Sequence, residues 1–181
     1  MALNVRATLL CAIGFGVIIS APGMLNASQD DAEKHCALGI ALEQQGNLDG
    51  AIAEFREALR ADPDLANAHT ALAVVLGMKS DFDGAEQEYR AAIHLHPDDA
   101  MVHTALAVVL GMKSDFDGAE REYRTAIRLR PDDVRAHVGL GLILGVKGNS
   151  DEGIAELRTA LRLNPNDAKT REALVRLENT Q

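Results

Sequence analysis

Histidine recurs at a fixed spacing along the chain, and imidazole is the side chain most often used to bind metals and to move protons near neutral pH. Four histidines lie 34 residues apart: His35, His69, His103 and His137. If each occupies an equivalent helix of a stack, neighbouring imidazoles are about 8–10 Å apart. A zinc ion needs several ligand nitrogens at about 2 Å. The spacing therefore favours a structural role in packing over a metal site.

Two shorter motifs are similar to ligand sets. His94 and His96 form an HxH pair, but side chains two residues apart on a helix do not face each other. Asp81, Asp83 and Gly84 match a fragment of a calcium-binding loop, yet the other oxygen ligands and the closing glutamate are absent. These residues instead favour a helix C-terminus complemented by positive charge and a helix N-cap, respectively.

Glycine and cysteine offer two further candidates for chemistry. Gly139, Gly141 and Gly145 spell GxGxxxG, which is neither the dinucleotide fingerprint nor a P-loop, and no strand precedes them. Close helix packing explains them better. Cys36 follows His35 directly, and adjacent residues on a helix point in different directions, which argues against a Cys–His nucleophile pair. The sequence thus predicts no enzyme activity, no cofactor and no metal.

The elements that carry these residues repeat every 34 positions. The passage HTALAVVLGMKSDFDGAE runs from His69 to Glu86 and returns unchanged at residues 103–120. Within each unit, apolar residues recur at helical spacing in two runs, so each unit predicts two helices. The unit ends at a proline, which cannot continue a helix. The four prolines in phase are Pro63, Pro97, Pro131 and Pro165.

Polar residues at the breaks predict how the helices begin. A Gly-Asn or Ser-Asp pair separates the two helices of each unit, and Asn or Asp is a preferred N-cap. The expected caps of the second helices are Asn47, Asp81, Asp115 and Asn149. The acidic pairs at 98–99 and 132–133 fall where the next helix begins, which is favourable against its dipole.

This pattern resembles the tetratricopeptide repeat, which places Leu-Gly in the first helix, alanine and an aromatic residue in the second, and proline at the end. The first unit matches at Leu38, Gly39, Ala51, Phe55, Ala58 and Pro63. The aromatic position holds Tyr89 and Tyr123 in the next units and Leu157 in the fourth, and the four histidines stand where the family often has tryptophan.

The resemblance implies an all-α fold, an α-solenoid in which helix-turn-helix repeats stack into a right-handed superhelix. The implied repeats are residues 32–65, 66–99, 100–133 and 134–167, preceded by a short segment at 28–31 and followed by a capping helix at 168–181. Leu174 and Leu177 lie on one side of that last helix.

The resemblance also implies a binding surface, because the family binds its partners on the concave face lined by the first helices. On that face we expect an apolar groove for a peptide or helix of a partner protein, formed by Ala71, Val74, Met78, Ala105, Val108, Met112, Val138, Leu142 and Val146. The family's carboxylate-gripping members need Lys, Asn and Arg on these helices, whereas this chain has Thr70, Ala71, Val74, Ala105 and Gly139. We therefore do not expect it to bind an acidic C-terminal tail. Two alternatives stay open: self-association through the groove, and small residues that merely let the superhelix curl tightly.

The N-terminus differs in character from the repeats. Residues 1–27 hold one charge, Arg6, before an apolar run at 7–19, then Pro22-Gly23 and the small residue Ala27. A short apolar core between a positive start and a helix-breaking pair is typical of a secretory signal peptide. We expect a bacterial signal cleaved after Ala27 and a periplasmic protein. The alternative is an uncleaved anchor that holds the chain on the inner membrane facing the periplasm.

Charge and cysteine content limit the partners. The chain carries a net charge of −9, which becomes −10 when Arg6 is removed with the leader. Such a surface repels nucleic acid and anionic lipid, so neither nucleic acid nor the membrane is an expected partner of the processed chain. Only Cys36 remains after residue 27, so no internal disulfide forms.

These observations predict a non-catalytic scaffold for protein–protein interaction. A membrane-tethered assembly factor of an envelope complex is the nearest alternative. A metal-binding or enzymatic protein whose site the sequence does not reveal is the alternative of another class.

The leader hypothesis makes one prediction about the exported chain. Its apolar core is shorter than the roughly 20 residues that a spanning helix needs, so the segment should be removed. Intact-mass spectrometry of the exported protein should therefore give a chain that begins at Ser28. A mass that still includes residues 1–27 would indicate the membrane anchor instead.

Overall fold

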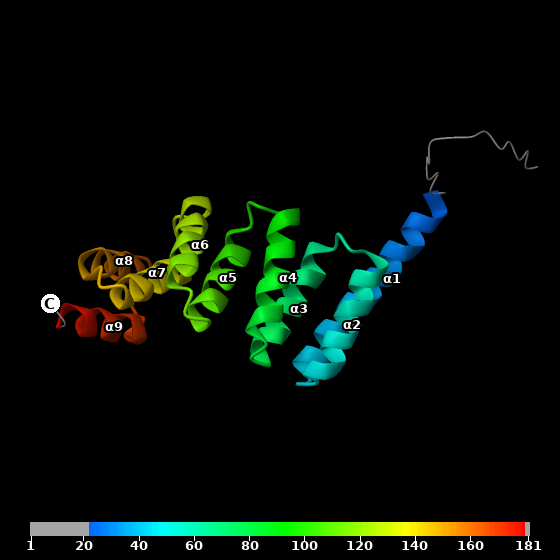
Figure 1. Cartoon of the computed structure of the whole chain (residues 1–181), viewed down its shortest axis with the longest axis horizontal. Helices are drawn as coiled ribbons and strands as arrows, with labels where there is room; N and C mark the ends of the chain where they lie inside the picture. Colours follow the sequence, from blue (N-terminus) through cyan, green and yellow to red (C-terminus); the bar gives the residue numbers. More distant parts are fainter. Residues whose placement is uncertain (1–21, 180–181) are drawn as a thin grey trace, which may run out of the picture.

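The computed structural model describes residues 22–179, and its regular structure there is entirely α-helical. Figure 1 shows the helices following one another along the long axis of the molecule. In chain order they are α1 (Pro22–Gln44), α2 (Leu48–Ala61), α3 (Ala66–Met78), α4 (Phe82–Leu95), α5 (Ala100–Met112), α6 (Phe116–Leu129), α7 (Val134–Val146), α8 (Ser150–Leu163) and α9 (Ala168–Glu178).

The helices form four hairpins and a final single helix. The closest packing is within the pairs α1–α2, α3–α4, α5–α6 and α7–α8, and each pair then packs on the next. First helices also touch one another, α1 with α3, α5 with α7 and α7 with α9, and so form one layer of the stack. The all-α solenoid predicted from the sequence is therefore confirmed.

Each hairpin buries the same three positions of its second helix. A small residue, a large one and another small one face inward, spaced so that all lie on one side of the helix. The large residue fills the hairpin while the small ones allow the first helix to come close. These residues are Ala51, Phe55 and Ala58 in α2, Ala85, Tyr89 and Ala92 in α4, Ala119, Tyr123 and Ala126 in α6, and Gly153, Leu157 and Ala160 in α8.

Both tyrosines are core residues. Tyr89 and Tyr123 are 4% and 5% exposed. Burial, with a smaller contribution from the Asp133 carboxylate, raises the pKa of Tyr123 to about 12. The ring is therefore a neutral phenol at physiological pH and acts as packing rather than as an acid or base.

The expected N-cap residues of the second helices are confirmed in all four repeats, but only three of them make the side-chain hydrogen bond of a cap. The side chains of Asn47, Asp81 and Asp115 each accept a hydrogen bond from the glycine amide three residues later. Asn149 precedes α8 but makes no such bond. Its helix begins Ser-Asp-Glu, so two carboxylates in the first turn favour the helix dipole without a cap.

The first helices begin as their sequences predict. The carboxylates of Asp99, Asp133 and Asp167 accept backbone amides of α5, α7 and α9. Asp133 is itself buried, and its second oxygen accepts the Thr104 hydroxyl of the preceding repeat at 3.1 Å. A cap of one repeat is thus also a contact to its neighbour.

The start of α1 corrects part of the sequence analysis. Gly23 was expected to break a helix, but α1 begins at Pro22 and runs through Gly23, Ala27 and the segment 28–31. Proline fits the first turn of a helix because that turn does not need its amide. Ser28 already touches the repeats, since its hydroxyl donates to the Ala61 carbonyl at 3.1 Å. The apolar run at 7–19 lies outside the described residues.

The final helix closes the stack as expected. Leu174 and Leu177 of α9 are half-buried against the last hairpin, while Lys169, Arg171 and Glu172 are exposed. A polar outer side of this kind is what ends a solenoid in water. None of the helices in the described part of the chain is long and apolar enough to cross a membrane.

The turns between paired helices contain one position with a positive φ, and in two repeats this position is occupied by serine instead of glycine. Gly46 and Gly148 have φ of 76° and 84°, and the equivalent Ser80 and Ser114 have φ of 64°. Only glycine adopts this left-handed conformation without steric cost, because it has no Cβ.

Ser80→Gly and Ser114→Gly should therefore each raise the free energy of unfolding by about 0.5–1 kcal/mol. Urea unfolding followed by circular dichroism measures the change. The reverse substitutions Gly46→Ser and Gly148→Ser are matched controls and should lower stability by a similar amount. A loss of stability in both serine-to-glycine variants would contradict the strain assigned to these turns.

Candidate functional site

Large apolar side chains remain in solvent along the layer of first helices. On α3, α5 and α7 they occur at two equivalent positions, one turn apart, and are between 39% and 64% exposed. Because the positions recur at steps of 34, the side chains of adjacent helices lie in register. We call this surface the apolar face; its residues are Val74, Met78, Val108, Met112, Leu142 and Val146.

The smaller expected groove residues lie beneath this surface. Ala71 and Ala105 are half-buried, as is Val138. Val138 is out of register with the alanines, however, because it occupies the position of Thr104, and the true equivalent in the fourth repeat is Gly139. A Cβ on Gly139 would lie only 2.2 Å from Cζ of Tyr123, so that ring takes the space of the missing side chain.

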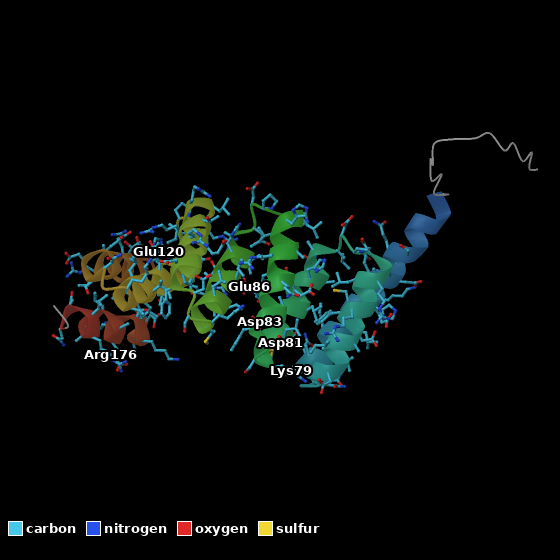
Figure 2. All side chains as sticks on the ribbon, in the orientation of Figure 1. Lys79, Asp81, Asp83, Glu86, Glu120 and Arg176 are labelled. Carbon is cyan, nitrogen blue, oxygen red and sulfur yellow. The ribbon has the colours of Figure 1, made fainter. Side chains whose placement is uncertain are left out.

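Charge is separated between the two layers. The helices α3, α5 and α7 contain no aspartate or glutamate, and their only Lys or Arg residue is Arg135. In the second to fourth repeats the acids lie on the second helices and in the loops, and Figure 2 labels Asp83, Glu86 and Glu120 among them. The apolar face is therefore free of carboxylates in a chain of net charge −9.

A pocket of about 400 Å³ opens in the apolar face between α3 and α5. Val74 and Gly77 line one side and Val108 and Met112 the other. The pocket also receives Arg135, from α7 of the following repeat. A large aliphatic or aromatic side chain fits such a volume.

A second pocket, of about 490 Å³, lies between the last hairpin and the capping helix. Leu142 and Val146 of the apolar face line it together with Leu177 and Arg176 of α9. Arg176 is held by an ion pair with Glu172, at 2.6 Å. The apolar face thus continues to the C-terminal end of the stack.

The four histidines each pair with a glutamate of the second helix in the same repeat. The Nδ1 atoms of His35, His69, His103 and His137 lie 2.6 Å from Oε2 of Glu54, Glu88, Glu122 and Glu156 respectively. In the last three repeats the other ring nitrogen meets a backbone carbonyl at 2.9–3.0 Å. These carbonyls belong to Pro63, Pro97 and Pro131.

This arrangement, which we call the histidine clamp, joins three pieces of chain. A carbonyl only accepts hydrogen bonds, so Nε2 is the donor in that contact, and Nδ1 faces the carboxylate. His103 and His137 are 6% exposed, so the clamp is inside the protein. It fixes the first helix to the second helix and to the proline that ends the previous repeat. His69, His103 and His137 thus each tie their own helix to acceptors from two other segments.

Lysines at the ends of the first helices bind acids of the preceding repeat. Lys113 contacts Asp83 and Glu86, and Lys147 contacts Asp117 and Glu120. The hydrogen bonds that Lys113 donates, first to Asp83 and then to Glu86, raise its pKa. These lysines are engaged with the second-helix layer and leave the apolar face without a positive charge of their own.

The remaining chemical candidates have structural surroundings. Asp81 accepts the Gly84 amide at 3.0 Å, as an N-cap does, and Asp83 pairs with Lys113. His94 is exposed in the last turn of α4, and His96 is its C-cap residue. Among residues 22–179, no group of three or more His, Cys, Asp or Glu side chains could hold a metal ion.

Cys36 and the fourth-repeat glycines are explained by packing. Burial, with Glu33 adding, raises the pKa of the Cys36 thiol, which keeps it in the less reactive protonated form. A Cβ on Gly141 would lie 2.8 Å from Cγ of Leu157, and one on Gly145 would lie 2.9 Å from Cδ1 of Leu177. Close helix packing at these glycines, expected from the sequence, is confirmed.

Sequence reasoning did not find several pocket residues, Met101 and Arg135 among them, nor the glutamates of the clamp. Met101 is 50% exposed at the edge of the pocket. Met101 and Arg135 both break the repeat, since their equivalent in the second repeat is Asn67. The glutamates, in contrast, recur at steps of 34 like the histidines, and that shared period was the available signal.

Comparison with known proteins supports the architecture. A family model described as tetratricopeptide repeat matches residues 36–100 and 104–168. A solved structure of PilF from Pseudomonas aeruginosa is 26% identical and superposes with a TM-score of 0.75, covering 85% of this chain and 70% of that one. No curated protein matches the sequence at a significant level.

Two other solved structures share the fold at lower identity. MamA from Desulfovibrio magneticus RS-1 is 19% identical with a TM-score of 0.79, over 83% of this chain and 85% of that one. YrrB, described as a TPR protein with an unusual peptide-binding site, is 20% identical with a TM-score of 0.71, over 82% and 76% of the two chains.

The histidine clamp predicts a stability cost. His103→Phe keeps a ring at this position but leaves the Glu122 carboxylate and the Pro97 carbonyl without their donor, so the free energy of unfolding should fall by about 1–3 kcal/mol. Chemical unfolding followed by circular dichroism provides the measurement. His94→Phe, at an exposed position, is the control and should change it by less than about 0.5 kcal/mol. Equal stability of His103→Phe and the unsubstituted protein would show that the clamp is not a structural tie.

Proposed function

Because the chain belongs to the tetratricopeptide repeat family, we propose that it is a non-catalytic scaffold that holds a peptide or helix of a partner protein against its apolar face. Family members generally serve as protein–protein interaction scaffolds. The apolar face is the part of this chain that suits the role, because it extends over three consecutive repeats and includes two pockets.

One observation carries the proposal. Six large apolar side chains stay in solvent in register on adjacent helices, although the same helices bury most of their other aliphatic residues. Leu72, Leu106 and Leu140, on the same three helices, are each 2% exposed. Contiguous exposed apolar surface on an otherwise well-packed protein commonly marks an interaction site.

The distribution of charge supports the same surface. A partner segment that lies along α3, α5 and α7 meets no carboxylate of these helices. Acids of the second helices α4 and α6 instead bind the lysines at the ends of α5 and α7, away from the apolar face. Docking of an apolar segment on this face therefore removes few charged groups of this chain from water, so the desolvation cost is small.

Tight curling of the superhelix was the alternative explanation for the small residues. It accounts for Ala71, Ala105 and Gly139, which are half-buried. It does not account for Met78 and Met112, which are 58% and 64% exposed. Methionine is unbranched and polarisable, so it adapts well to a partner surface.

We propose that the scaffold works outside the cytoplasm, on the strength of the leader-like sequence at residues 1–27. A membrane-tethered assembly factor is the second candidate. It is favoured by α1, which runs through the proposed cleavage point after Ala27 without a break and would serve as the stalk of an uncleaved anchor.

The proposal predicts that a charge on the apolar face impairs binding without unfolding the protein. Val108→Glu and Met112→Glu should change the free energy of unfolding by less than about 0.5 kcal/mol, because both positions are in solvent. Affinity for the partner should fall at least about tenfold, since the complex would bury an unpaired carboxylate.

The partner for this measurement is the protein captured in the cell of origin by a photoreactive amino acid at position 112. Leu163→Glu is the matched control, because Leu163 is an exposed apolar residue on α8 outside the apolar face. If the glutamate variants bind as well as Leu163→Glu, recognition lies elsewhere. If they unfold, Val108 and Met112 belong to the core.

A further inference from the structure

The pocket between α3 and α5 restricts the chemistry of the partner more than the rest of the apolar face does. It combines a defined apolar volume of about 400 Å³ with a single charged residue, Arg135. Inferring the partner from these features rests on the proposed function, since it presumes that the apolar face binds a polypeptide.

The pocket exists because one packing contact of the repeat becomes weaker from the C-terminal to the N-terminal end. Gly145, Gly111 and Gly77 are equivalent positions, and the first two face the residue 32 positions later. A Cβ on Gly145 would lie 2.9 Å from Leu177, and one on Gly111 would lie 3.5 Å from Ile143. At Gly77, whose counterpart is Val109, a Cβ would meet nothing within 4 Å.

The residues at this position are Leu177 on α9, Ile143 on α7 and Val109 on α5, and the valine side chain is the smallest of the three. The contact that Leu177 and Ile143 supply from within the chain is therefore missing at Gly77. Both Gly77 and Val109 line the pocket. The space left open corresponds to the end of a larger apolar side chain, so a partner residue of the size of leucine, methionine or phenylalanine would complete the packing.

Arg135 adds a charge that the neighbouring repeats lack. Its equivalents on α3 and α5 are Asn67 and Met101, and its side chain is exposed. The nearest acid in the sequence, Asp133, is already occupied, because its carboxylate accepts the amides of residues 135 and 136 and the Thr104 hydroxyl. No ion pair of Arg135 is found among residues 22–179.

The electrostatic setting restricts what Arg135 can bind. A guanidinium forms strong paired hydrogen bonds with a carboxylate. One arginine in a chain of net charge −9 does not attract a polyanion such as nucleic acid or an anionic lipid surface. The complementary ligand is a mostly uncharged segment that carries an isolated acid. The chain's own residues 1–27 do not qualify, because they contain no acid and one cation, Arg6.

We propose that the pocket takes a large apolar side chain of the partner and that Arg135 binds a side-chain carboxylate in the same segment. The partner is thus an apolar peptide or helix with an aspartate or glutamate close to its anchor residue. Met101 and Met112 cover the anchor on either side, as both line the pocket and are at least half exposed.

A display selection tests this partner chemistry without knowledge of the natural partner. Random 16-residue peptides, with 16 being about four to five helical turns, are fused through their C-termini so that no free terminal carboxylate is present. They are selected on the full repeat protein and on four variants. Arg135→Gln removes the charge, Val109→Leu and Gly77→Ala fill the pocket, and Arg128→Gln removes an exposed arginine of α6 as the matched control.

The expected result is a set of peptides that pairs a large apolar residue with an aspartate or glutamate. Selection on Arg135→Gln should lose the enrichment in acids but keep the apolar residue, and single peptides should bind that variant about tenfold more weakly. The pocket-filled variants should lose the preference for the large residue, and Arg128→Gln should behave as the unsubstituted protein. Thermal unfolding of each variant checks that the fold is kept; Gly77→Ala serves if Val109→Leu is unstable.

The other outcomes separate this inference from the proposed function. Peptides without acids, or an acid preference that persists in Arg135→Gln, would overturn the inference while leaving the apolar face as a binding surface. Failure of the unsubstituted protein to enrich any peptide would contradict both. A dimer in sedimentation analysis that dissociates on Arg135→Gln would assign the pocket to a second copy of this chain and overturn the peptide partner.

Discussion

A helical hairpin of this size has too much apolar surface to bury by itself, and this constraint governs the whole structure. Each hairpin covers one side of its neighbour and is covered in turn, so every unit must present matching surfaces in both directions. That requirement fixes the 34-residue period of Phe55, Tyr89, Tyr123 and Leu157, which occupy one buried position of the second helices. It also fixes the prolines, because a unit that ended one residue later would rotate the next helix out of register.

Polar contacts inside the stack select this register. The histidine clamp and the lysine contacts to Glu86 and Glu120 both cross between segments, and both glutamates are nearly buried. In the first and last repeats the equivalent residues are Ile52 and Ile154. Buried ion pairs contribute little net stability but penalise misalignment, since a shifted helix would leave a charge unpaired. The middle repeats, which have a neighbour of the same kind on each side, are the ones that carry them.

The sequence was sufficient to predict features that depend on residue type or on the 34-residue period. Helix positions followed from the apolar spacing, and the caps at Asn47, Asp81 and Asp115 followed from their residue types. Asn149 is the N-cap of α8 as expected but makes no side-chain bond, and two acids in the first turn favour the helix dipole instead. The helix break expected at Gly23 was wrong, because α1 begins at Pro22 and one glycine does not end it.

The pocket could not be predicted from the sequence. It depends on the size of the side chain at the position of Val109, which leaves the space beside Gly77 open. Arg135 reaches it from another repeat.

Separation of charge and apolar surface between the two helix layers links this architecture to the proposed scaffold role, and that link is the central claim. Methyl NMR of the protein with labelled methionine, leucine and valine, titrated with the captured partner or a selected peptide, tests it most directly. We predict that the methyl signals of Met78, Met101 and Met112 shift, while those of Leu163 and Val175, which are exposed outside the apolar face, stay in place. Shifts at Leu163 or Val175 with unchanged methionine signals would contradict the claim and place recognition on another surface.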